Sequence, residues 1–196
     1  MTKVKFDRTE VDVGNILALE HVNVTVPDQP IATFFYVNLL GFTRDPYMDF
    51  GPSNVWVNVG RQQFHLPTAK AQVLRGHVGV VVPDLKSLLV RLEKMSRRLK
   101  DTQFSFTERK NYLDITCPWG NHLRCFRPGT FGKVQLGIPY IELHVPTDSA
   151  PGISRFYEQV MGCRTRINKK EKPVRGPHRP GTIYSIQGNT QTRTFL

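Results

Sequence analysis

A repeat constrains this chain more than any other feature of its sequence. Two segments, EHVNVTVPD and GHVGVVVPD, join a Val-rich run to a Val-Pro-Asp turn, and YIELHVPTD is a weaker third copy with a Val-Pro-Thr turn. A helical pattern follows each turn. The turns at Val26, Val82 and Val145 are spaced by roughly 60 residues. That period is longer than the common solenoid units, so each copy should fold as a small module.

The first copy predicts one helix and four strands. Val22, Val24 and Val26 alternate with polar residues, which is typical of a half-buried strand. A helix is expected over 31–40, where apolar residues recur at helical spacing, and Gly41 is placed to end it. Three more strands are predicted, over residues 42–47, 54–59 and 62–66. The order is therefore βαβββ.

The second and third copies repeat this order. The second has a helical pattern over 85–99 and hairpin chemistry at the turn 118–121, Pro-Trp-Gly-Asn. The third has a predicted strand over 140–145 and a helix over 151–161, with further strands over 163–167, 182–187 and 190–196. We predict an α+β fold of tandem βαβββ modules. The boundaries are a lead-in over 1–17, modules over 18–66 and 76–127 paired around a shared cavity, and an unpaired module over 138–196.

A few polar side chains of the first two modules should meet in that cavity. His21 and His77 hold the same position on the first strands of their copies, and Tyr140 holds it in the third copy. His65 and Arg124 lie on the last strands of the first two modules. Because successive side chains of a strand point to opposite faces, these residues can share the face that carries no helix.

Four segments carry a resemblance to a known family: LEHVNVTV, FYVNLLGF, GHVGVVVPDL and CPWGNHLRCF. They resemble the vicinal oxygen chelate superfamily, which contains glyoxalase I, extradiol dioxygenases, and the fosfomycin and bleomycin resistance proteins. The resemblance covers residues 18–127 as a module pair and 138–196 as a third module. In metal-dependent members the ligands come from the first and last strands of each module. The resemblance thus implies His21, His65 and His77 as metal ligands and places Arg124 at the fourth position.

Arg124 departs from the family, which usually has a glutamate there. Three imidazoles suit Fe, Zn, Ni, Mn or Co, whereas a guanidinium stays protonated and cannot coordinate a metal. One interpretation is a three-histidine metal site in which Arg124 binds an acidic substrate, with Gln63 and Tyr112 lining the cavity. The other is that the metal is lost, and Arg124 either binds a ligand or pairs with Asp114 across the hairpin.

Three functions stay open at this point. The first is a metal-dependent lyase, isomerase or dioxygenase that acts on a small acidic molecule; no general base can be named for it. The second is a non-catalytic protein that binds such a molecule without metal. The third is a structural protein that binds anionic surfaces through the basic loop 169–179, since the net charge is +11. No nucleic-acid-binding motif accompanies the charge, so we do not expect a nucleic acid partner.

The remaining expectations concern compartment and assembly. No apolar run is long enough to span a membrane, and no secretory signal begins the chain. Cys117, Cys125 and Cys163 lack metal-ligand spacing, which favours reduced thiols in a cytoplasmic protein. An unpaired third module would leave a sheet edge uncovered. We therefore expect a homodimer formed through that module, or a chain shortened from four modules.

Overall fold

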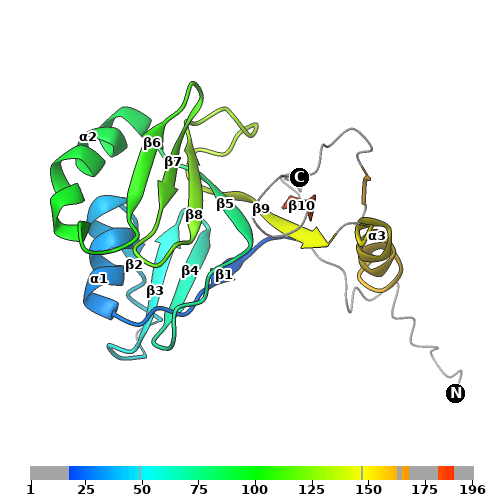
Figure 1. Ribbon diagram of the computed structural model, residues 1–196, viewed down its shortest axis with the longest axis horizontal. Helices are drawn as coiled ribbons and strands as arrows, with labels where there is room; N and C mark the ends of the chain where they lie inside the picture. The colour runs from blue at the N-terminus through cyan, green and yellow to red at the C-terminus, as the bar shows by residue number, and fades with distance from the viewer. Residues whose placement is uncertain (1–17, 49, 147, 163–164, 168–180, 188–196) are drawn as a thin grey trace, which may run out of the picture. The chain divides into compact units, whose positions relative to one another are not determined.

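The protein is described by a computed structural model over residues 18–48, 50–146, 148–162, 165–167 and 181–187 (Figure 1). The chain divides into two compact units, Met1–Ala18 with His144–Tyr184, and Leu19–Leu143 with Ser185–Leu196. The second of these units contains both complete modules and all of the predicted site residues. The predicted α+β fold with βαβββ modules is confirmed.

The first module forms a four-stranded sheet in the order β1-β4-β3-β2. Its elements are β1 (His21–Asn23), α1 (Gln29–Thr33) with a π-helical continuation η1 (Phe34–Leu39), β2 (Thr43–Arg44), β3 (Asn54–Val59) and β4 (Gln62–Pro67). The Asp28 side chain caps α1 by accepting a hydrogen bond from the Ile31 amide. Strand β2 is shorter than predicted because the Asp45 carboxylate accepts the Tyr47 and Met48 amides, which turns the chain there.

The second module repeats this arrangement. It consists of β5 (Gly76–Val81), α2 (Leu85–Met95) followed by the 3₁₀ turn η2 (Ser96–Leu99), β6 (Ser105–Glu108), β7 (Tyr112–Thr116) and β8 (His122–Phe126). Asp84 caps α2 as Asp28 caps α1, by accepting the amides of Lys86 and Ser87. Strand β5 pairs parallel to β8, as β1 pairs to β4. The two copies therefore share topology as well as sequence pattern.

The third copy differs from its prediction in two respects, its pairing with the second module and a missing strand. It supplies β9 (Gly137–Pro146), α3 (Ala150–Gln159) and β10 (Gly181–Gln187). Strand β9 pairs antiparallel with β5, so that it extends the second module's sheet to the order β10-β9-β5-β8-β7-β6. The open edge of β5 accounts for this, since pairing satisfies backbone groups that would otherwise face solvent. Residues 165–167 do not form the expected strand, and 163–164 and 190–196 lie outside the described residues.

One hydrophobic core joins the first two modules. Figure 1 shows α1 and α2 on the same side of the sheets, and buried residues of η1 and α2, such as Phe35, Leu39, Leu88 and Leu92, belong to one cluster with the inner strand residues. Arg91 of α2 donates hydrogen bonds to the carbonyls of Leu39 and Leu40 at the end of η1. A cation suits this position because helix ends leave carbonyl groups without partners. The opposite faces of both sheets are left to polar and aromatic side chains.

The length of the helices and the burial of the cysteines are two further features of the described chain. None of the described helices is long and apolar enough to cross a membrane. Cys117 and Cys125 are buried free thiols, and Cys163 lies outside the described residues. Burial raises the pKa of Cys125 to about 12, so this thiol is protonated and unreactive at neutral pH.

Candidate functional site

The helix-free face of the first sheet carries a cluster of His21, Trp56 and His65. The strand register places Asn23 and Trp56 on either side of His65, so these side chains share one face. The His65 ring stacks on Trp56 with 3.9 Å between ring centroids, and His21 meets the Trp56 ring edge-on at 5.1 Å. The two histidine rings lie 6.2 Å apart.

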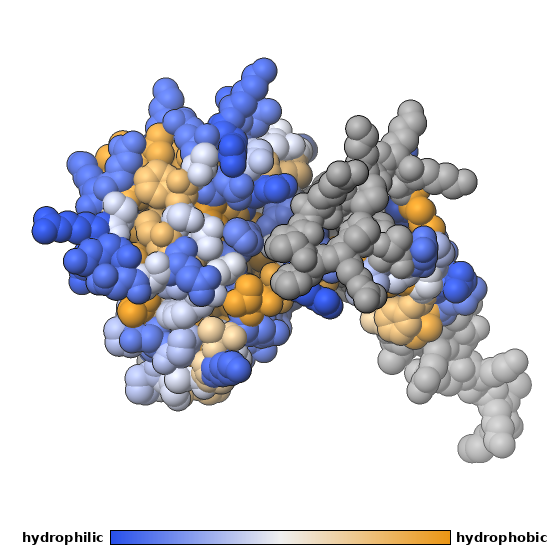
Figure 2. All heavy atoms as spheres, in the orientation of Figure 1, coloured by the Kyte–Doolittle hydropathy of each residue, from blue (hydrophilic) through white to orange (hydrophobic). Residues whose placement is uncertain are grey.

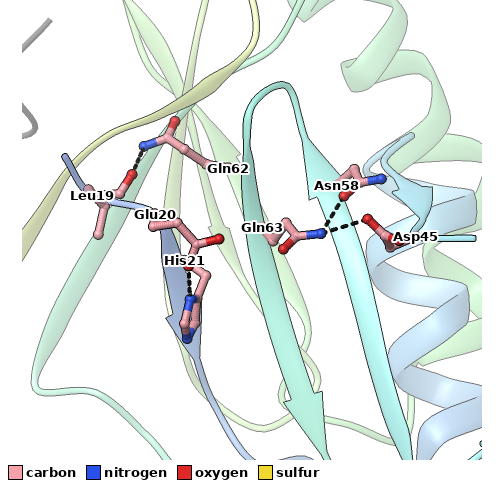
Figure 3. Close-up of polar contacts among 7 residues, drawn as sticks. All are labelled: Leu19, Glu20, His21, Asp45, Asn58, Gln62 and Gln63. Atoms are coloured by element: carbon pink, nitrogen blue, oxygen red, sulfur yellow. Dashed lines mark hydrogen bonds and ion pairs between the residues drawn. The ribbon is translucent and has the colours of Figure 1, made fainter. Parts of the chain in front are cut away.

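Each histidine of this cluster has a ring nitrogen in contact with a neighbouring protein group. His65 Nε2 lies 2.5 Å from the Asn54 side-chain oxygen, and His21 Nδ1 contacts the Glu20 carboxylate (Figure 3). Burial lowers the pKa of His65, and the nearby His21 lowers it further. His65 is therefore neutral at pH 7 and held by stacking. The Trp56 Nε1 atom is buried without a hydrogen-bond partner among the described residues.

Two adjacent glutamines of β4 have different roles. Gln63, predicted to line the cavity, donates 2.7 Å hydrogen bonds to Asp45 and Asn58, as Figure 3 shows. Gln62 points away from them and donates to the carbonyls of Leu19 and Ile138, while it accepts the Ile138 amide. The Gln62 side chain thus bonds to backbone groups of β9, as the backbone of a neighbouring strand would. Alternation on β4 predicts that the two glutamines point to opposite faces, but it does not identify these partners.

The helix-free face of the second sheet contains His77, which is 4% exposed. Its Nε2 lies 2.9 Å from the Tyr140 hydroxyl oxygen, and its Nδ1 lies 3.3 Å from Glu142 Oε1. A carboxylate only accepts hydrogen bonds, so in the neutral ring Nδ1 carries the proton and Nε2 accepts the Tyr140 hydroxyl. The result is an oriented chain from Tyr140 through His77 to Glu142.

Tyr140 reaches His77 because β5 has a glycine opposite it. Gly79 pairs with Tyr140 in register, and a Cβ atom on Gly79 would lie 2.1 Å from Tyr140 Cε1. The tyrosine ring therefore occupies the space that a side chain at position 79 would fill. Burial raises the pKa of Tyr140 to about 12, although the charge of Arg124 and a hydrogen bond from it act in the opposite direction. At neutral pH the Tyr140 hydroxyl keeps its proton.

Arg124 lies next to this chain on β8, opposite Gly79 in register. Its guanidinium carbon is 5.3 Å from the centre of the Tyr112 ring, and its Nε atom is buried with no hydrogen-bond partner among the residues that the structure describes. Asp114 stands opposite Arg124 in the hairpin register, but no ion pair joins these two described residues. Arg124 is thus flanked by two tyrosines rather than neutralised by an acid.

The predicted metal ligands do not form a single group. His21 and His65 lie together on the first sheet, whereas His77 is engaged by Tyr140 and Glu142 of β9. Among the described residues there is no set of three His, Cys, Asp or Glu side chains placed to hold a metal ion. The histidines present therefore do not fit a three-ligand metal site, and we derive no chemical step through a metal.

The structure brings together Arg124, Tyr112 and His77 from the predicted set, and it adds Tyr140 and Glu142. Sequence reasoning gave no role to Glu142, because the third copy was expected to lack a partner module. One signal could have identified Tyr140, since it holds the position of His21 and His77 in the repeat. We refer to Tyr112, Arg124, His77, Tyr140 and Glu142 as the second-sheet cluster.

Comparisons with known proteins bear on the fold. No protein-family model and no curated protein sequence matches the chain. A Bacillus subtilis structure provisionally described as a dioxygenase is similar, with 20% identity and a TM-score of 0.53, over 89% of this chain and 64% of that one. A lactoylglutathione lyase from Agrobacterium tumefaciens matches 56% of this chain and 92% of its own, with 18% identity and a TM-score of 0.41. A glyoxalase/bleomycin resistance protein/dioxygenase superfamily member from Sphaerobacter thermophilus covers 57% of this chain and 98% of its own, with 20% identity and a TM-score of 0.42.

At these identities the likeness concerns the fold alone. The Bacillus subtilis match and the two βαβββ modules agree with each other, and they agree with the resemblance in the sequence. The chain shares its fold with the Bacillus subtilis structure, and this is the fold that the resemblance to the vicinal oxygen chelate superfamily predicts.

Proposed function

We propose that this protein binds a small acidic molecule through Arg124 on the helix-free face of the second sheet. The observation that carries the proposal is the buried Nε atom of Arg124, which has no hydrogen-bond partner in the described part of the chain although it belongs to a cation. An unsatisfied buried donor costs about 1–3 kcal/mol, and more when it is charged. A ligand oxygen would remove that cost.

The surroundings of Arg124 favour a carboxylate ligand. A carboxylate binds a guanidinium side-on through two parallel hydrogen bonds, one of which goes to Nε. Tyr112 and Tyr140 flank the guanidinium and are able to contact a small organic molecule with ring and hydroxyl groups. Arg124 as a whole residue is only partly buried although its Nε atom is buried, so a ligand oxygen would have to reach Nε from the exposed part of the side chain. Binding of this kind requires no metal.

Binding can be tested with a series of small mono- and dicarboxylates and their neutral amides. Isothermal titration should detect carboxylates and not the matching amides. Arg124→Gln should weaken carboxylate binding at least tenfold, because it removes a pair of charge-assisted hydrogen bonds. Arg127→Gln is the matched control, because Arg127 is an exposed arginine just beyond the same strand. Equal affinities of wild type and Arg124→Gln would refute the proposal.

A second candidate function is acid–base catalysis on the bound molecule. The chain from Tyr140 through His77 to Glu142 favours it, because a carboxylate that orients a histidine is the arrangement of a general base. This would make the protein a lyase or isomerase. In deuterated buffer, NMR can follow the exchange of a ligand proton beside its carboxylate for solvent deuterium. This exchange should occur with wild type and stop with His77→Gln. Exchange at the same rate in wild type and His77→Gln would exclude this role.

Two predictions from the sequence, the basic loop and the homodimer, concern regions apart from this site. The basic loop 169–179 lies outside the described residues, so its binding to anionic surfaces stays a prediction. A homodimer formed through the third copy also stays a prediction, with light scattering as its measurement.

A further inference from the structure

A depression on the second module lies away from the second-sheet cluster and has its own chemistry. Its volume is about 310 Å³, and its lining residues come from η2 and from the start of β6: Ser96, Arg97, Lys100, Phe104, Ser105 and Phe106. We call it the η2–β6 depression. In Figure 2 the region over α2 and β6 shows pale orange side chains bordered by blue, hydrophilic ones. The sequence RLEKMSRRLK, one of the two basic stretches of the chain, ends here.

The local geometry places two cations on the same side of η2. A 3₁₀ helix has three residues per turn, so side chains three apart eclipse each other. Arg97 and Lys100 have that spacing within the turn Ser96–Leu99 and the residue that follows it, and both are exposed. Neither makes an ion pair with a described residue, although Glu93 and Asp101 lie nearby in the sequence. Two positive charges therefore meet over the depression without a compensating acid.

The floor of the η2–β6 depression is aromatic. Phe104 lies just before β6 and Phe106 lies within it, and this spacing of two residues places their rings on the same face. The ring centroids are 6.0 Å apart, and both rings pack against the main hydrophobic core. Core packing holds the rings in place while each stays partly exposed. Arg98, the neighbour of Arg97, is occupied elsewhere, with its guanidinium carbon 4.3 Å from the Phe34 ring centre.

We infer that the η2–β6 depression binds a single-ring aromatic molecule that carries one phosphate or carboxylate group. The two cations recognise the anionic group by charge-assisted hydrogen bonds, and the hydroxyls of Ser96 and Ser105 are available as further donors. Phe104 and Phe106 contact the ring of the ligand. The depression is small and open to solvent, so it suits one ring with one anionic group rather than a larger, enclosed ligand. This site is distinct from the one proposed around Arg124.

The test titrates the full-length chain with phenyl phosphate at low ionic strength and follows backbone amides by NMR. The amides of 96–106 should shift, and the affinity should exceed that for phenol and for inorganic phosphate. The double variant Arg97→Gln/Lys100→Gln should weaken binding about tenfold, because exposed charge pairs each contribute modestly. Arg109→Gln/Lys110→Gln makes the same change of charge on the β6–β7 turn, outside the depression, and should bind as wild type does.

The outcomes separate this site from the Arg124 site. Loss of binding in Arg97→Gln/Lys100→Gln, with binding kept in Arg124→Gln, supports the inference. Loss of binding only in Arg124→Gln overturns it and leaves the proposal for Arg124 standing. Inorganic phosphate that binds as tightly as phenyl phosphate would also overturn it, because the aromatic floor would then have no role. Thermal unfolding of each variant shows whether the fold is intact.

Discussion

The helix-free faces of the two sheets have the same topology but differ in how their histidines are held. On the first sheet, His65 stacks on Trp56 and bonds to Asn54, so residues of its own module hold it. On the second sheet, His77 takes both of its partners, Tyr140 and Glu142, from β9 of the third copy. Repetition of a module thus preserves the backbone and leaves the chemistry of each face to its neighbours.

The difference follows from which sheet edge is covered. Strand β9 pairs with β5, so its polar side chains reach the second face. The first module is hydrogen-bonded to the same strand through the side chain of Gln62, whose amide binds backbone groups of Leu19 and Ile138. The added strand β9 therefore completes the candidate site on the second sheet. The helix-free face of the first sheet remains a packed aromatic cluster. The variants below test that contrast, from the largest expected effect to the smallest.

Gly79→Ala should have the largest effect. The new Cβ would lie 2.1 Å from Tyr140 Cε1, so the ring must leave its position beside His77. Overpacking and the lost hydrogen bond together should lower the free energy of unfolding by about 3 kcal/mol, measured by denaturant titration. The same substitution in a Tyr140→Ala background should cost far less, because the ring is gone. Equal costs in both backgrounds would show that the glycine is not there to admit Tyr140.

Gln62→Ala should separate the first module from β9. The change removes two hydrogen bonds to carbonyl groups and one from the Ile138 amide, with an expected loss of about 2 kcal/mol in the free energy of unfolding. Hydrogen exchange at the Ile138 amide should accelerate in parallel. Gln63→Ala is the matched control on the same strand, and it should leave Ile138 protected because Gln63 binds Asp45 and Asn58. An unchanged rate of hydrogen exchange at the Ile138 amide in Gln62→Ala would contradict the proposed link between the first module and β9.

Tyr140→Phe should act on the second face alone. It removes the hydroxyl that bonds His77 Nε2, which should cost about 1 kcal/mol at neutral pH. The effect depends on pH, because the pKa of Tyr140 is raised to about 12 from the ordinary value of 10.0. Above pH 10 the unfolded chain loses this proton first, so wild-type stability falls between pH 10 and 12. Unfolding curves at pH 9, 10 and 11 should show a smaller fall for Tyr140→Phe. Parallel curves would mean that Tyr140 does not titrate in this way.

The repeat predicted most of the backbone but not the sharing of a sheet between copies. Alternating Val residues and the caps at Asp28 and Asp84 are local signals, and the strands and helices of both modules follow them closely. The pairing of β9 with β5 is not local. Any strand with a free edge is a possible partner, and a hydrophobic pattern does not select among them.

The same limit applies to the candidate site. The sequence predicts Arg124 as a candidate anion-binding group, because its strand position and its charge are both visible there. Its neighbours Tyr140 and Glu142 required knowledge of the β9 register. The roles of Gln62 and Gln63 could not be told apart either, since alternation predicts opposite directions and not what lies in each direction.

The smallest expected effect concerns the first face, where His21→Asn should raise the pKa of His65. Two causes lower that pKa, burial first and then the charge of His21, and the substitution removes only the second. The pKa of His65 should therefore move toward 6.5 without reaching it, as measured by NMR titration of its ring protons. At a pH above the ordinary histidine pKa of the unfolded chain, a histidine with a lowered pKa in the fold does not weaken stability. As the pH falls, the unfolded chain takes up the proton first, so the free energy of unfolding decreases. His21→Asn should make that loss on acidification smaller. The second face supplies the contrast, since His77 lies on another sheet and its ring-proton chemical shifts at neutral pH should be unchanged in His21→Asn. A change at His77 as large as at His65 would mean that the two faces share one electrostatic site and are not held independently.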